Sequence, residues 1–154
     1  MLVILIVVLN DEPAVENTGG VADISTIGTV STPTELELSV DVVIEDGFPF
    51  IDVFLNLPNG ALVMATVDGN GYTGQDSEPL NFGRAILGPF SQDHQPLPLG
   101  EYSLRITAPL ANVQPQEIRG LLGDNYANFY GEHFFDNEIG LRSIVFETTF
   151  TVNE

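Results

Sequence analysis

The chain of 154 residues contains no cysteine, no lysine and no tryptophan. Without cysteine it can form neither disulfides nor Cys-ligated zinc sites, and it has no thiolate nucleophile. Its length is sufficient for one domain whose core needs no such covalent or metal links. Apolar residues make up 44% of the chain and charged residues 17%. This balance predicts a packed globular domain rather than a disordered chain.

Positive charge is almost absent. The chain carries 22 acids and a formal net charge of -18, against which stand only Arg84, Arg105, Arg119 and Arg142. So acidic a surface repels phosphate backbones and anionic lipid headgroups, and we therefore expect no nucleic-acid partner. Because salt screens self-repulsion, the composition is typical of a marine or halophilic source, and equally of a well-solubilised secreted protein.

An uninterrupted apolar run occupies residues 1–9 and ends abruptly at polar residues. It is too short to cross a bilayer but suits the apolar part of a signal peptide or a clipped anchor, with a buried β-strand as the alternative. We therefore expect a secreted, periplasmic or cell-surface location, with membrane contact only through this segment. Residues 10–34 are rich in Gly, Ser, Thr, Pro and acids. They predict a polar acidic linker.

Apolar and polar residues alternate with period two over much of residues 35–153. This pattern predicts strands at residues 35–42, 50–55, 61–67, 84–87, 101–107 and 143–152, with a short polar edge segment at 72–82. Pro115, the apolar spacing of Ile118 and Leu122, and Gly123 predict one short inserted helix at about residues 115–122. The prediction is an all-β domain, an immunoglobulin-like antiparallel β-sandwich, although a barrel would produce a similar pattern.

Three stretches form a recognisable set: Asn-Leu-Pro-Asn-Gly at 56–60, Gly-Pro-Phe at 88–90 with Pro-Leu-Pro-Leu-Gly-Glu-Tyr at 96–102, and Pro-Leu-Ala-Asn-Val-Gln-Pro at 109–115. In this order they resemble uncharacterised bacterial secreted proteins with an immunoglobulin-like or fibronectin-like β-sandwich domain. The resemblance implies the same fold and export, and it brings no catalytic residues. The aromatic stretch at 125–130 departs from the glycine-rich pattern of that group.

One loop carries a candidate calcium site. Asp68, Asn70, Asp76 and Glu78 place oxygen atoms along a predicted turn, which makes calcium the one possible cofactor. The segment does not match an EF-hand loop, because Thr73 stands where glycine is needed and Pro79 where the bidentate glutamate is needed. An ordinary hairpin loop is the alternative.

Two further loops are candidates for ligand binding. Tyr126, Phe129 and Tyr130 belong to an aromatic-rich segment, which either forms an exposed platform for a saccharide or protein partner or caps the core. The absence of tryptophan weakens the saccharide interpretation. The proline-rich loop at residues 92–98 is a candidate protease-inhibitor loop.

No catalytic constellation is present in the sequence. His94 and His133 lack the Gly-x-Ser-x-Gly context of a serine hydrolase, and with so many acids no pair of carboxylates stands out. We therefore predict a non-catalytic exported module with an interaction or envelope-structural role. The alternatives are a module that binds a carbohydrate or a protease, and a carboxylate-based hydrolase. The oligomeric state stays open.

Overall fold

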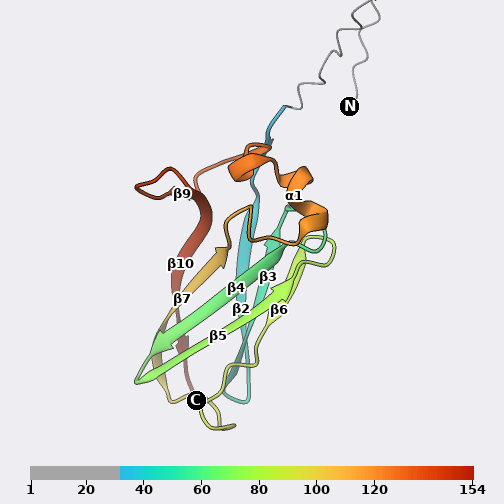
Figure 1. Ribbon diagram of the computed structural model, residues 1–154. Coiled ribbons are helices and arrows are strands. Elements are labelled where there is room, and N and C mark those ends of the chain that lie inside the picture. The colour runs from blue at the N-terminus through green and yellow to red at the C-terminus, as the bar shows by residue number, and fades with distance from the viewer. Residues whose placement is uncertain (1–31) are drawn as a thin grey trace, which may run out of the picture. The chain divides into compact units, whose positions relative to one another are not determined.

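The computed structural model describes residues 32–154 (Figure 1). The predicted apolar segment at residues 1–9 and residues 10–31 of the predicted linker at 10–34 lie outside the described residues, and the last linker residue, Thr34, is part of a short strand. The described part is an immunoglobulin-like antiparallel β-sandwich with one short α-helix, which confirms the predicted fold class. Within it, no helix is long and apolar enough to cross a membrane.

The smaller sheet has the strand order β2-β3-β6. It contains β2 (Leu38–Glu45), β3 (Phe48–Leu55) and β6 (Arg84–Leu87), all antiparallel. Buried and less buried residues alternate along β3 and β6, as the period of a strand requires. The sheet therefore has one face in the core and one face towards solvent.

The larger sheet has the strand order β5-β4-β7-β10-β9. Its members are β4 (Leu62–Gly69), β5 (Tyr72–Pro79), β7 (Gly100–Ala108), β9 (Phe134–Asp136) and β10 (Arg142–Val152). The predicted polar edge segment is β5, a full-length strand at the edge of this sheet. The chain crosses between the sheets after β3, after β5 and after β6, which is the connectivity of an immunoglobulin-like sandwich.

The core lies between the two sheets and includes Tyr102 at the start of β7. The Tyr102 hydroxyl donates a hydrogen bond to the carbonyl of Pro98, four residues upstream, at 2.8 Å. This contact is the tyrosine corner that immunoglobulin-like domains place at the entry of the equivalent strand. The Tyr102 ring also stacks on Phe150 of β10, with ring centroids 5.6 Å apart.

One end of the sandwich is closed by short elements. These are α1 (Gln116–Leu122), the 3-10 helix η1 (Asp124–Tyr126), and β1 (Thr34–Glu35) paired in parallel with β8 (Phe129–Tyr130). The C-terminus lies at the opposite end (Figure 1). Pro115 precedes α1 instead of being its first residue.

A buried amide joins this closing segment to the larger sheet. Gln114 is completely buried, and its side chain accepts a hydrogen bond from Leu62 N at 2.8 Å and donates one to Leu62 O at 3.1 Å. Leu62 needs this partner because the pairing of β4 with β7 begins two residues later, at Met64. Gln114 also donates to the hydroxyl of Tyr126 at 3.2 Å, and that hydroxyl donates to the carbonyl of Pro109.

Candidate functional site

The candidate calcium ligands lie on two faces of one hairpin. Asp68 pairs with Thr73 on the outer face of the larger sheet. Asp76 and Glu78 are paired with β4 residues whose side chains point into the core, so these two carboxylates are on the other face. Glu78 is also five residues beyond Thr73, which is about 17 Å along an extended strand.

The polar atoms of three of these residues have protein partners. Asn70 donates to the carbonyl of Glu101 at 3.0 Å, and Asp76 accepts from the backbone N–H of Gly88 at 2.7 Å. Asp68 accepts a hydrogen bond from the hydroxyl of Thr73. Among residues 32–154, no three His, Asp or Glu side chains are grouped so that they could hold a metal ion. The structure thus does not bring the four predicted ligands together.

The aromatic loop is divided between core and surface. Tyr126 is completely buried and Phe129 is 9% exposed, whereas Tyr130 is 51% exposed. Burial raises the pKa of Tyr126 to about 12. The ring of Phe134 packs on Tyr126 at 5.7 Å and is covered by the guanidinium of Arg142 at 5.1 Å. Tyr126, Phe129 and Tyr130 therefore do not share one exposed face.

The proline-rich loop closes on itself. Gln92 and Gln95 exchange two backbone hydrogen bonds of 3.0 and 2.8 Å around Asp93 and His94, whose φ angles are 51° and 64°. The next residues turn inward, and Leu97 is buried in the core. A protease-inhibitor loop presents an extended segment, so this tight turn does not offer that shape at residues 92–95.

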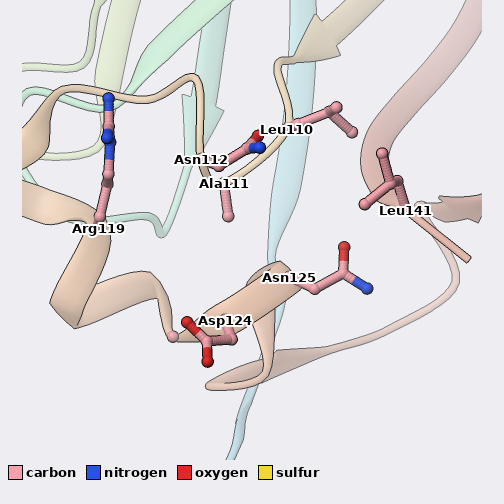
Figure 2. A pocket seen from close by; sticks show the side chains of 8 residues that line it. Leu110, Ala111, Asn112, Arg119, Asp124, Asn125 and Leu141 are labelled. Atoms are coloured by element: carbon pink, nitrogen blue, oxygen red, sulfur yellow. The ribbon is translucent and has the colours of Figure 1, made fainter.

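A small pocket lies between α1, η1 and the loop that follows β7 (Figure 2). Its volume is about 220 Å³, below the usual range for small-molecule sites. The Asn125 side chain in its wall is already used, since it donates to Gly140 O at 2.9 Å and accepts from Arg142 N at 2.7 Å. Arg119 extends away from Asp124 and Asn125 (Figure 2) and donates to the carbonyl of Gln114. These polar groups hold the loops together.

The outer face of the smaller sheet carries several exposed apolar side chains, with Asp52 and Arg84 lying between them. We define the apolar face as Val43, Phe50, Phe54, Phe82 and Ile86. Val43 is 46% exposed, Phe54 39%, Phe82 90% and Ile86 56%, while Phe50 is half-buried. Val43 is the cross-strand partner of Phe50, and Phe54 and Ile86 lie on the neighbouring strands β3 and β6. An exposed apolar surface spread over adjoining strands is typical of a protein-binding site.

A shallow groove of about 350 Å³ follows this face. Within it, Arg84 forms a bidentate ion pair with Asp52, and that contact lowers the pKa of the Asp52 carboxyl. Asp41 and Glu45 project from β2 on the same side of the sheet and have no cationic partner among the described residues. The apolar face therefore has an acidic margin.

The outer face of the larger sheet is different in composition. Thr66, Arg105 and Glu147 lie side by side across β4, β7 and β10, and Arg105 is 3.5 Å from the Glu147 carboxylate. None of the large hydrophobic residues that are exposed in the described part of the chain lies on β4, β5, β7 or β10. On the described strands of the larger sheet, Phe135 of β9 is the one exposed large hydrophobic residue, whereas β2, β3 and β6 of the smaller sheet carry Val43, Phe54 and Ile86.

The sequence interpretation missed the apolar face. Two signals were present: β3 has apolar residues at both alternating sets of positions, and Asn81-Phe82-Gly83-Arg84 has a phenylalanine in a turn-forming context. The first signal does not show which set of residues is exposed, because a strand in the middle of a three-stranded sheet can carry apolar residues on both faces with one face in water. The second places a bulky ring where a tight turn normally has Asn or Gly.

Comparison of the chain with protein-family models, with curated proteins and with solved structures gave no match. No homologous family is therefore identified, and the structure shows the antiparallel β architecture alone.

Proposed function

We propose that this chain is a non-catalytic, exported β-sandwich module that binds another protein through the apolar face. The observation that carries the proposal is the exposure of Val43, Phe54, Phe82 and Ile86 on the outer side of the smaller sheet. Leaving such side chains in water forfeits about 25 cal/mol for each Å² of apolar surface. A partner that covers the face would recover that free energy.

Two features of the sequence support the exported location. The apolar run at residues 1–9 suits a signal peptide or an anchor, and the motifs at 56–60, 88–102 and 109–115 resemble those of secreted bacterial sandwich domains. An envelope-structural role fits the same face if the partner is a fixed component of the cell surface. The resemblance supports export and does not indicate a particular ligand.

The other candidate functions have less support. A saccharide platform at the aromatic loop would depend on Tyr130, since Tyr126 and Phe129 are buried. A carboxylate-based hydrolase needs two facing acids in a cleft; the small pocket contains Asp124 as its single carboxylate, and in the groove on the smaller sheet Asp52 is already paired with Arg84. The apolar face is therefore the surface to test first.

A random peptide library displayed on phage tests the proposal even while the partner is unidentified. The full chain is the bait, and the double variant V43S/I86S is the counter-selection bait. The control bait is T66A/T149A, which alters the polar outer face of the larger sheet. We expect the enriched peptides to bind the native chain and the control equally, and V43S/I86S at least about tenfold more weakly. Peptides that bind all three baits equally, or a failure to enrich any peptide, would contradict the proposed function.

A further inference from the structure

Phe82 combines two features that give its ring no stabilising role in the fold. Its side chain is 90% exposed, the largest exposure among the exposed hydrophobic residues of the described chain. Its backbone is also left-handed, with φ of 49°, a region where a bulky side chain is strained. A sequence selected for stability alone would have Asn or Gly at this position.

The turn that carries Phe82 is held rigidly. Asn81 and Arg84 exchange two backbone hydrogen bonds of 2.8 and 3.1 Å, so Phe82 and Gly83 form a two-residue hairpin loop. The Phe82 N–H donates to the side chain of Asn59 at 2.9 Å. These bonds hold the backbone from which the phenyl ring projects.

The same turn is joined to the apolar face. The carbonyl of Gly83 accepts a hydrogen bond from the backbone N–H of Leu55 at 2.8 Å. A Cβ atom at Gly83 would lie 2.9 Å from the ring of Phe54, so glycine is required there for that ring to pack against the turn. Phe82 thus stands at the margin of the apolar face, next to Phe54.

We propose that Phe82 is the anchor residue of the interface, inserted into an apolar pocket of a partner protein whose rim carries Lys or Arg. This inference rests on the proposed function and names the chemistry of the partner. Interfaces are dominated by a few rigid aromatic side chains that fill pockets, and a strained, pre-organised turn reduces the entropy lost on docking. Insertion gives a reason for both the strain and the exposure.

The charge of the partner follows from the surroundings of the anchor. Asp41, Glu45 and Asp52 lie on the same side of the sheet, and the one cation there, Arg84, is already paired with Asp52. Lys or Arg on the partner would face Asp41 and Glu45 and speed encounter by electrostatic attraction. A second copy of this chain also has a formal net charge of -18, so two copies repel each other. The charge therefore favours a different protein with a cationic rim over self-association.

Charged β-cyclodextrins provide minimal probes of this chemistry, because each offers an apolar cavity for one phenyl ring and a rim of chosen charge. The full chain is titrated with amino-substituted and with carboxymethyl-substituted β-cyclodextrin, and the backbone amides of residues 81–84 are followed by NMR. We expect the amino form to bind at least about tenfold more tightly than the carboxymethyl form, with the preference falling as salt is added. The variant Phe82→Asn should lose the shifts at residues 81–84, whereas Phe135→Asn, at an aromatic residue 57% exposed on β9, should keep them.

Several results would contradict the proposed role of Phe82 as the anchor residue. Equal binding of the two cyclodextrins would refute the cationic rim, and unchanged shifts in Phe82→Asn would refute the role of the ring. Self-association that strengthens with salt and disappears in Phe82→Asn would identify a second copy as the occupant instead. If library peptides need Val43 and Ile86 but bind Phe82→Asn normally, Phe82 is not the anchor residue, and the proposed function still holds. A library that yields no face-dependent peptide removes the proposed function itself.

Discussion

The aromatic loop and the turn at residues 81–84 use aromatic side chains in opposite ways. In the loop, Tyr126 is completely buried, hydrogen-bonded to Gln114 and Pro109, and packed against Phe134. In the turn, Phe82 is 90% exposed on a backbone that resists a bulky side chain. The backbone of Tyr126 is left-handed as well, with φ of 61°, but its ring gains burial in the core, whereas the ring of Phe82 gains none.

The difference shows why a high density of aromatic residues is a poor guide to a binding surface. A loop that closes the end of a sandwich has to cover an open core, and large rings do so efficiently. The aromatic residue of the turn at 81–84 has no such use, because its side chain is exposed to solvent. Substitutions around the loop should therefore change stability most, and substitutions in the turn should change binding.

The largest effect is expected where the loop is joined to the sheet. Gln114→Ala removes the partner of both backbone groups of Leu62 and one partner of Tyr126, all in a buried position. We expect the free energy of unfolding to fall by about 4 kcal/mol, because each orphaned buried group costs about 1–3 kcal/mol. Urea unfolding measures it. Gln116→Ala, at an exposed position of α1, is the matched control and should change stability by less than about 0.5 kcal/mol. Equal effects of the two substitutions would contradict the structural role of the loop.

The next effect is a loss of stability at alkaline pH. Burial raises the pKa of Tyr126 from 10.0 to about 12, so the unfolded chain loses this proton first as the pH rises. The stabilisation is complete below pH 10 and is lost as the pH rises to about 12, a loss of about 3 kcal/mol. Unfolding by urea at a series of pH values checks it. Tyr126→Phe should flatten the decline, while Tyr130→Phe should keep it; a decline that persists in Tyr126→Phe would assign it to another group.

Much of the fold was predictable because the alternation of apolar and polar residues along a strand reflects which side chains are buried. The predicted strand at 84–87 coincides with β6, and the predicted strand at 50–55 lies within β3. The polar strand β5 was underestimated because its residues have little strand propensity, and its eight residues are extended through pairing with β4. The short strands β8 and β9 were missed for a different reason: two or three residues show no periodic pattern, and pairing with a neighbouring strand decides them.

The site was harder to predict than the fold. Candidate ligands at Asp68 and Glu78 were placed on one turn, but strand pairing continues to Pro79 and separates their faces. The apolar face depends on which of two sets of alternating residues points to solvent, and a strand with apolar residues in both sets does not reveal this. The positive φ of Phe82 was not predictable from Asn81-Phe82-Gly83, because glycine at the third position of a common turn is normally preceded by a residue with negative φ.

A smaller effect, of opposite sign, is expected at the turn. Phe82→Asn relieves the strain of a left-handed phenylalanine, and the ring it removes is in water in the folded and the unfolded chain alike, so the free energy of unfolding should rise by about 1 kcal/mol. Thermal and urea unfolding both measure it. Phe82→Ala keeps the unfavourable backbone and should gain less, which separates backbone strain from side-chain exposure. A destabilised Phe82→Asn would mean that the ring packs against the domain and is not presented to a partner.

The smallest effect tests the one exposed ring of the aromatic loop. Tyr130 lies in β8, where its carbonyl accepts a hydrogen bond from Leu36 N at 2.8 Å while its side chain is 51% exposed. Tyr130→Ser leaves that backbone bond in place, so stability should change by no more than about 0.5 kcal/mol, measured by thermal unfolding. The variant should also bind library peptides as the native chain does. If Tyr130→Ser weakened peptide binding while V43S/I86S did not, the aromatic loop would be the interaction surface, and the contrast between the loop and the turn at residues 81–84 would be reversed.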